Sequence, residues 1–184
     1  MELQGKVVTF IPTASTPESY KEYVKLGQES LEKLGLKVAP LDVATASSEE
    51  IRSTLSQGDL IYISGGNTFY LLQELKRKGA DKLIQEEIEG GKPYIGESAG
   101  AMILAPSVEY VQLMDETHVA SELASFAALG LISRYPLPHY RCFPFEGVGE
   151  KVLATYGDKL SLIPITNDQA IIVRGSELTI VTKE

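Results

Sequence analysis

Short apolar runs alternate with amphipathic stretches over the first part of the chain. The runs are rich in β-branched residues and are bounded by polar, glycine or proline positions, which predicts buried β-strands. The intervening stretches repeat apolar side chains at three- and four-residue spacing, which predicts helices packed on a sheet. The predicted strands are residues 6–11, 36–43, 59–64 and 92–96, and the predicted helices are residues 17–34, 68–78, 80–89 and 99–104, with a further short helix that is capped by Ser47 or Ser48 and ends at Leu55.

This alternation of strands and helices predicts a doubly wound α/β fold. Strands that are apolar on both sides belong to a mostly parallel sheet with helices on both faces. Ligands of such sheets bind at the carboxyl ends of the strands, where loops lead into helices. The third and fourth predicted strands both run into glycine-rich turns, so we expect the chemistry at this edge of the sheet.

Beyond residue 104 the pattern is less regular. Residues 107–114 and 131–137 are predicted as strands and residues 144–156 as a helix. Residues 160–165, 170–173 and 178–181 are predicted as short strands, the last two forming an antiparallel hairpin around Gly175. Without a repeat, a low-complexity tract or a linker-like change in composition, we predict a single domain over residues 1–184.

Composition narrows the function classes. The 184 residues are 43% apolar and 23% charged, as in soluble globular proteins, and the net charge of −8 argues against nucleic acid or an anionic membrane as a partner. The single cysteine, Cys142, excludes an internal disulfide and a multi-cysteine metal site. Because no apolar run is long enough to span a membrane and the N-terminus lacks a secretory pattern, we expect a cytoplasmic protein.

The most informative stretch is Gly96-Glu97-Ser98-Ala99-Gly100, a G-x-S-x-G pattern between a predicted strand and a predicted helix. A nucleophile elbow requires this context, because the sharp turn exposes the serine oxygen above the sheet edge and needs small neighbours. The helix N-terminus that follows would stabilise a developing oxyanion. The same residues would also suit a tight turn in which Ser98 caps the helix.

A serine nucleophile needs a base, and the chain has two histidines. His139 follows a predicted strand in a segment whose backbone is restrained by prolines, and it is the favoured base. His118 lies in a polar loop and is interpreted as an exposed residue. For the carboxylate that would orient the base, Asp115 gives the chain order Ser98, Asp115, His139, while Glu116 and Asp168 stay as alternatives.

A second glycine turn, Ser64-Gly65-Gly66-Asn67-Thr68, ends the third predicted strand. It matches neither the dinucleotide fingerprint nor the phosphate-binding P-loop. Its backbone N–H groups could supply half of an oxyanion hole, or the turn could simply be capped by Asn67 or Thr68. Asn67, together with Arg141 and Asp168, is a candidate for contact with the substrate. Arg141 would bind a substrate carboxylate or remain an exposed charge.

Cys142 is an alternative nucleophile three residues after His139. It lacks the elbow context and is followed by the apolar Phe143, so we interpret it as a structural thiol.

Three motifs in order resemble the peptidase E and cyanophycinase family of serine peptidases. They are G-G-N-T-F at 65–69, G-x-S-A-G-A at 96–101 and P-H-Y at 138–140, and the segment 10–15 is also similar to that family's first strand and loop. The resemblance covers nearly the whole chain. It implies a fold like that of class I glutamine amidotransferases, with Ser98 at the elbow in place of cysteine.

The resemblance also implies the roles of individual residues. His139 would be the general base, the N–H groups of Gly66 and Ala99 would bind the oxyanion, and the third triad member would fall near residues 113–116, where Asp115 is our choice. Some family members are dipeptidases that cleave after an N-terminal aspartate, and others hydrolyse cyanophycin. Aspartate-specific members carry arginines in the helix after the histidine, whereas the predicted helix 144–156 has none and a single lysine, Lys151.

The sequence therefore predicts a serine peptidase that acts on small peptides without a metal or cofactor. The triad would be Ser98, His139 and Asp115, with an acyl-enzyme intermediate. A homodimer is compatible with this interpretation. Two other hypotheses are a non-catalytic domain that binds a small metabolite at the glycine turns, and an amidase or esterase with the same triad.

Overall fold

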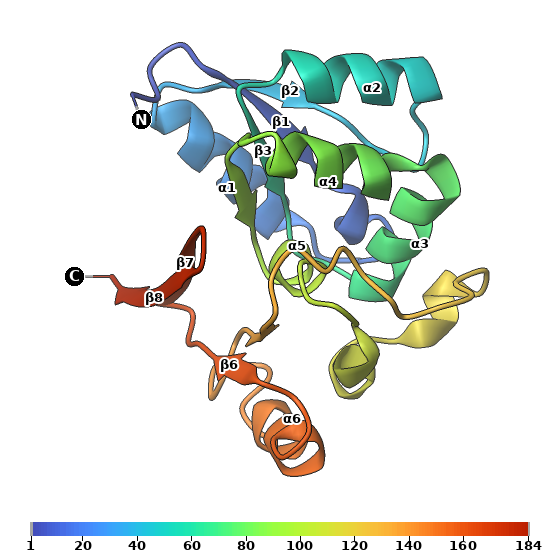
Figure 1. Ribbon diagram of the computed structural model, residues 1–184, viewed down its shortest axis with the longest axis vertical. Coiled ribbons are helices and arrows are strands. Elements are labelled where there is room, and N and C mark those ends of the chain that lie inside the picture. The colour runs from blue at the N-terminus through green and yellow to red at the C-terminus, as the bar shows by residue number, and fades with distance from the viewer. Residues whose placement is uncertain (1, 184) are drawn as a thin grey trace.

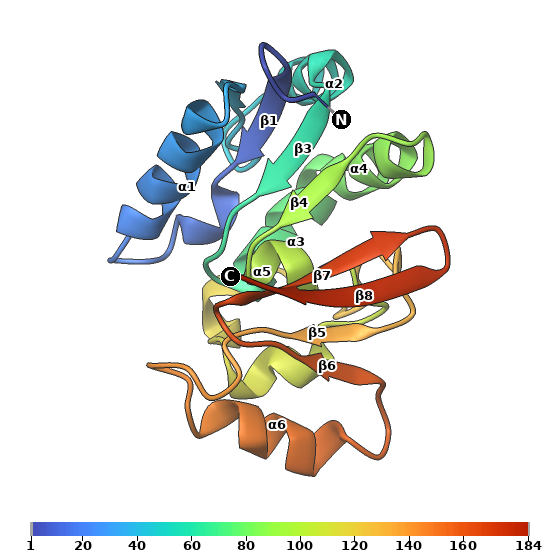
Figure 2. The same cartoon turned by 90° about the vertical axis from the view of Figure 1, so that its left-hand side faces the viewer.

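A four-stranded parallel sheet forms the first half of the molecule (Figure 2). The structure, a computed structural model, describes residues 2–183. The strands lie in the order β2 (Lys37–Pro40), β1 (Val7–Ile11), β3 (Leu60–Ile63) and β4 (Tyr94–Gly96). All four predicted strands are confirmed with shorter ends, and the carboxyl ends of β1, β3 and β4 face the same edge.

Helices cover both faces of this sheet, as predicted (Figure 2). Helix α1 (Glu22–Lys33) lies on one face, and α2 (Ser48–Gln57), α3 (Thr68–Lys78) and α4 (Ala80–Glu89) lie on the other. Alternate side chains of the strands point to opposite faces and so form two apolar cores. The smaller core beneath α1 contains Val8, Phe10, Leu31, Leu36, Leu60 and Tyr62.

The predicted bounds of α3 and α4 are confirmed, whereas α1 begins at Glu22 rather than at Pro17. Residues 12–20 cross the carboxyl end of β1 instead of joining the helix. They include a buried 3-10 turn at Thr13–Ser15. This turn brings the carbonyl of Ala14 against the second glycine turn, where it accepts a hydrogen bond from Asn67 N–H at 2.8 Å.

The second half carries a separate pair of parallel strands, β5 (Tyr135–Leu137) and β6 (Leu162–Pro164). Between them the chain forms α6 (Val148–Tyr156), which begins four residues later than predicted. The predicted C-terminal hairpin is confirmed as β7 (Gln169–Arg174) and β8 (Glu177–Thr182). Gly175 turns between them with φ 60°, and the hairpin projects from the body in Figure 1.

The strand predicted at 107–114 is wrong. After one isolated bridge from Ser107 to Ala127, residues Glu109–Leu113 form a 3-10 helix. The apolar side chains that become buried are Val108, Tyr110 and Val111, and Val111 N–H bonds to Val108 O at 3.0 Å. Because Val108 and Val111 are three positions apart, a 3-10 turn buries both on one side, which an alternating strand cannot do. Of the strand predicted at 131–137, only 135–137 forms.

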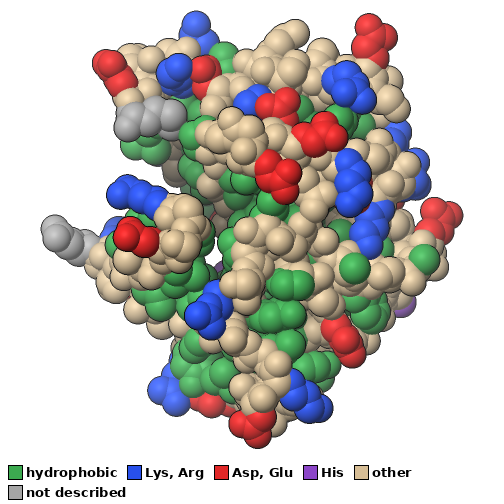
Figure 3. All heavy atoms as spheres, viewed as in Figure 1, with side chains coloured by type: hydrophobic (Ala, Val, Ile, Leu, Met, Phe, Trp, Pro, Cys, Tyr) green, Lys and Arg blue, Asp and Glu red, His purple; other side chains and the backbone are tan. Residues whose placement is uncertain are grey.

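Over residues 2–183, none of the helices combines the length and the apolar character that a membrane crossing requires. On the face seen in Figure 3, acidic and basic side chains are interspersed over the half that carries α2, α3 and α4, and apolar side chains gather in the other half. The β7–β8 hairpin also has exposed apolar side chains at Val173, Ile180 and Val181.

Candidate active site

Ser98 lies on the sharp turn between β4 and α5 (Ala99–Met102), at the carboxyl edge of the sheet. Its backbone has φ 48° and ψ −106°, a conformation that residues with a Cβ rarely adopt. Glycine is required at positions 96 and 100, because other backbone segments approach these residues too closely to leave room for a Cβ. A Cβ at Gly96 would lie 2.5 Å from the carbonyl of Gly100, and one at Gly100 would lie 2.3 Å from Ile63 O. The turn is therefore strained and closely packed, as a nucleophile elbow would require.

His139 lies two residues beyond the end of β5, with its ring against Ser98. Its Nε2 is 2.9 Å from Ser98 Oγ, within hydrogen-bond distance. The imidazole stacks on Phe145, with ring centroids 5.1 Å apart and planes 20° from parallel. The backbone at His139 has φ 59°, and its carbonyl accepts a hydrogen bond from Cys142 N–H at 3.0 Å. The structure thus brings together the two residues that the sequence singles out as nucleophile and base.

The other ring nitrogen of His139 contacts a residue that sequence reasoning missed. Nδ1 is 2.7 Å from Asn167 Oδ1. Asn167 follows β6, and β5 and β6 are parallel neighbours with Leu137 paired to Pro164, so their carboxyl ends meet. The position of Asn167, in the loop after a predicted strand, is the feature of the sequence that could have indicated this contact. The sequence prediction named the neighbouring Asp168 instead, because a carboxylate is expected there.

Within residues 2–183, the hydrogen-bond partners of the His139 ring are Ser98 and Asn167, and Asp115 is not among them. Its Oδ2 accepts a hydrogen bond from the backbone N–H of Thr68 at 2.8 Å, at the N-terminus of α3. Burial raises the pKa of the Asp115 carboxyl, and the N–H of Thr68 opposes this shift. Asp115 follows the 3-10 helix at Glu109–Leu113, and its carboxyl group is hydrogen-bonded to the start of α3.

The second glycine turn lies beside the nucleophile. A Cβ at Gly65 would be 3.3 Å from Ser98 Cβ, and one at Gly66, where φ is 131°, would collide with the carbonyl of Ala14 at 2.3 Å. Within residues 2–183, neither the N–H of Gly66 nor that of Ala99 donates to a protein acceptor. These two donors come from the two turns that meet at Ser98, an arrangement suited to a developing oxyanion.

The side chain of Asn67 makes one hydrogen bond through its oxygen and one through its nitrogen. It is 5% exposed, its Oδ1 accepts from Tyr70 N–H at 2.9 Å, and its Nδ2 donates to Glu116 O at 2.9 Å. Through these two bonds it caps α3 and fastens the loop at 115–116.

Arg141 is exposed beside His139, with φ 56°. Its Nε donates to Glu150 Oε1 at 2.8 Å, and its guanidinium lies 5.0 Å from the centre of the Tyr140 ring. The hydroxyl of Tyr140 donates to the same carboxylate oxygen at 2.8 Å. This exposed network holds the guanidinium at the edge of the site.

Three further residues lie away from the reacting atoms. Asp168 is exposed, and its backbone carbonyl accepts from Lys183 N–H at 2.7 Å. Cys142 is half-buried, and its Sγ lies 3.4 Å from Tyr140 O. His118 is three-quarters exposed, in the loop position that the sequence predicts, with Nε2 3.4 Å from Glu116 Oε2.

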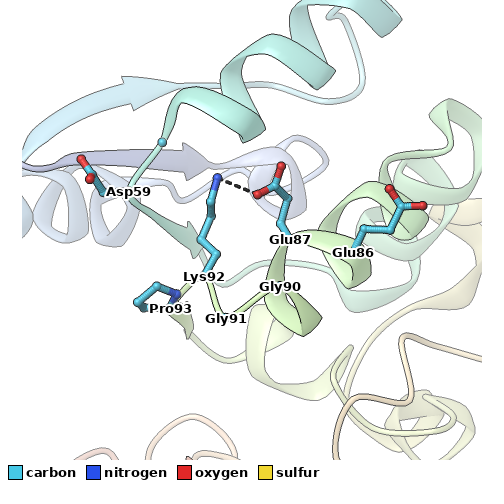
Figure 4. A pocket seen from close by; sticks show the side chains of 8 residues that line it. Asp59, Glu86, Glu87, Gly90, Gly91, Lys92 and Pro93 are labelled. Carbon is cyan, nitrogen blue, oxygen red and sulfur yellow. Dashed lines mark ion pairs between the residues drawn. The ribbon is translucent and has the colours of Figure 1, made fainter.

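A surface hollow of about 480 Å³ lies at the opposite edge of the sheet (Figure 4). Its lining includes the residues that precede β3 and β4, and the ammonium of Lys92 crosses it to Glu87 at 2.8 Å. It is remote from Ser98, because Ser98 follows the carboxyl end of β4. Among the described residues, no group of three or more His, Cys, Asp or Glu side chains is arranged to hold a metal ion.

Comparison with known proteins agrees on one family. The model of peptidase family S51 matches residues 1–181. The uncharacterized peptidase Lin0382 of Listeria innocua is 54% identical over 176 residues, which cover 96% of this chain and 84% of the relative. A peptidase E of Shewanella amazonensis is 32% identical over 178 residues, covering 93% of this chain and 72% of the relative. The crystal structure of a Listeria monocytogenes EGD-e protein provisionally assigned to peptidase E has a TM-score of 0.95 at 50% identity, covering 99% of this chain and 88% of that one.

Proposed function

The chain belongs to peptidase family S51 and is a serine-type peptidase, and from this premise we propose that it hydrolyses small peptides with Ser98 as the nucleophile. The observation that carries the proposal is the 2.9 Å approach of His139 Nε2 to Ser98 Oγ at a strained elbow. Strain of this kind persists only where the surrounding structure enforces it, and it is concentrated at functional sites.

The reaction proceeds through an acyl-enzyme. Ser98 Oγ attacks the peptide carbonyl as its proton passes to His139 Nε2, and the same proton then goes to the leaving amine. Water repeats the sequence on the ester and releases the acid product. The N–H groups of Gly66 and Ala99, which lack protein acceptors within residues 2–183, stabilise the negative charge on the carbonyl oxygen.

For Asp115 we propose a role other than that of the expected triad acid. Its hydrogen bond to Thr68 N–H fixes the first residue of α3, two positions after Gly66. Asn67 fastens the same turn through Ala14 and Glu116. We assign to Asp115 the positioning of the oxyanion turn, since its side-chain oxygen accepts a hydrogen bond from a free N–H group at the N-terminus of α3.

The substrates proposed are dipeptides and other short peptides. Family S51 includes proteins named peptidase E, and relatives of that name match this chain over most of its length. An N-terminal aspartate is one candidate for the residue before the cleaved bond. Helix α6 carries Lys151 as its one cationic side chain, and Arg141 shares its charge with Glu150, so cationic groups for an acidic side chain are few.

The test combines a variant with a chemical probe. Ser98→Ala is expected to lower kcat/KM on a dipeptide panel by about 10⁴-fold or more, since it removes the nucleophile. A fluorophosphonate probe should label the wild-type chain and not this variant. Ser53→Ala, in the middle of α2, is the matched control and should keep full activity and labelling.

Three results would contradict the proposal in different ways. Full dipeptide hydrolysis by Ser98→Ala would end the assignment of the nucleophile. Absence of labelling of the wild-type chain would favour a non-catalytic binding domain. Hydrolysis of simple esters or amides with dipeptide cleavage at background would favour an amidase or esterase.

A further inference from the structure

We propose that Asn167 is the residue that orients His139, so that an uncharged amide takes the place of the carboxylate expected in the triad. The inference rests on the peptidase function proposed above and deepens it. Asn167 is a positioning residue, because it contacts the imidazole and not the reacting atoms.

The hydrogen bonds of His139 define which ring nitrogen carries the proton. To accept the proton of Ser98 Oγ, Nε2 must be unprotonated in the resting enzyme. Nδ1 of the neutral ring then carries the hydrogen and requires an acceptor. The side-chain oxygen of Asn167 lies 2.7 Å away and is such an acceptor. The contact therefore selects the tautomer in which Nε2 is free to act as a base.

The fold holds Asn167 in place from both sides. Tyr140 N–H donates to Ile165 O at 3.0 Å, which ties the segment after β5 to the segment after β6. On the other side, the carbonyl of Asp168 accepts from Lys183 N–H at 2.7 Å, beyond the end of β8. The loop that bears Asn167 is thus fastened to the strand pair that bears His139 and to the C-terminal hairpin.

An amide performs one of the two tasks of a triad carboxylate. It accepts the Nδ1 hydrogen and so fixes the ring, but it has no charge to stabilise the imidazolium that forms during attack. Asp115 does not supply this charge by direct contact, because its hydrogen bond is to Thr68 N–H. Replacement of Asn167 by aspartate should therefore keep the orientation and add the missing charge.

The experiment measures the rate of fluorophosphonate labelling, which requires no knowledge of the natural substrate. In this step Ser98 Oγ bonds to phosphorus, fluoride leaves, and the serine proton passes to His139. Asn167→Ala is expected to lower the rate about tenfold or more through loss of orientation. Asn167→Asp should label at least as fast as the wild-type chain. Ser176→Ala, in the exposed turn of the β7–β8 hairpin, is the control and should not change the rate.

A second readout is independent of activity. The chain has two histidines, so ¹⁵N NMR resolves their tautomers with His118 as an internal reference. At a pH where the rings are neutral, His139 should carry its hydrogen on Nδ1 in the wild-type chain and in Asn167→Asp, and shift toward the Nε2–H form in Asn167→Ala. A wild-type labelling rate in a folded Asn167→Ala variant, or an unchanged His139 tautomer in it, would overturn the inference. If the wild-type chain were never labelled, the peptidase proposal would fail, while the NMR comparison would still decide the role of Asn167.

Discussion

The strained backbone of Ser98 predicts that glycine at this position gives a more stable fold than alanine does. With φ 48° and ψ −106°, Ser98 lies outside the regions open to residues with a Cβ, and such a conformation costs about 1–3 kcal/mol. Glycine adopts it freely, but its greater freedom in the unfolded chain costs about 0.5–1 kcal/mol. Ser98→Ala keeps the Cβ and, like glycine, loses the bond to His139. Ser98→Gly should therefore be more stable than Ser98→Ala by about 0.5–2 kcal/mol.

The free energies of unfolding of Ser98→Gly and Ser98→Ala are compared by urea and thermal unfolding. Both transitions are monitored by circular dichroism, because the chain has no tryptophan. For a chain of this size the expected difference corresponds to a rise in Tm of about 1–8 °C. The matched pair is Ser53→Gly and Ser53→Ala in the interior of α2, where glycine should be the less stable of the two by about 1 kcal/mol. The strain argument is refuted if glycine is no more stable than alanine at position 98 while position 53 behaves as expected.

Two further predictions concern the oxyanion turn. Gly66→Ala should lower kcat by about 10²–10³-fold in dipeptide assays with the fold retained. The new Cβ would lie 2.3 Å from the Ala14 carbonyl and would displace the backbone N–H of residue 66. A near-normal kcat would remove Gly66 from the mechanism. Burial raises the pKa of Asp115, so the folded state holds that proton more tightly than the unfolded state, and stability is lost as pH rises from the unfolded to the folded pKa. Asp115→Asn should therefore gain Tm relative to the wild-type chain as the pH rises above the unfolded pKa of Asp115, and a difference in Tm that does not change with pH would contradict this.

The parts of the site that sequence predicts are those in which local chemistry and backbone geometry agree. The turn at Ser98 can be predicted from sequence because it requires a strand before it, a helix after it and glycines at 96 and 100. Each of these requirements is visible as a pattern of residues in the sequence. The turn at 65–66 can be predicted for the same reason. There is no room for a side chain at Gly66 against Ala14, so glycine is required there. The turn at 65–66 follows β3, whose residues are all buried, and the turn at Ser98 follows β4, which is only partly buried.

The parts that sequence does not predict depend on contacts between distant segments. Whether Asp115 or Asn167 reaches His139 is decided by the pairing of β5 with β6 and by the 3-10 helix before Asp115, and neither is visible in a single sequence. The residue type of Asn167 was also misleading, because the partner of the histidine in a triad is expected to be an acid and not an amide. Asn167 and Asp168 are adjacent, and it is the side chain of Asn167 that contacts the imidazole.

The hydrogen bond between Ser98 and His139, proposed above as catalytic, joins two separate sets of strands, so the proposed site depends on the packing between them. Ser98 and the glycine turn belong to the ends of β4 and β3, whereas His139 and Asn167 belong to the ends of β5 and β6. The two sets are not hydrogen-bonded to each other as one sheet, so the 2.9 Å contact between Ser98 and His139 is maintained by what packs between them. The segment between the two sets is bonded to β5 through the buried Tyr110 hydroxyl, which donates to Pro136 O at 2.5 Å, and it is bonded to the end of α5 through Leu129 N–H, which donates to Ile103 O at 2.9 Å. Because a displacement of about 1 Å at a reacting pair can cost a hundredfold in rate, the buried residues of this segment belong to the requirements of catalysis although they are far from the substrate.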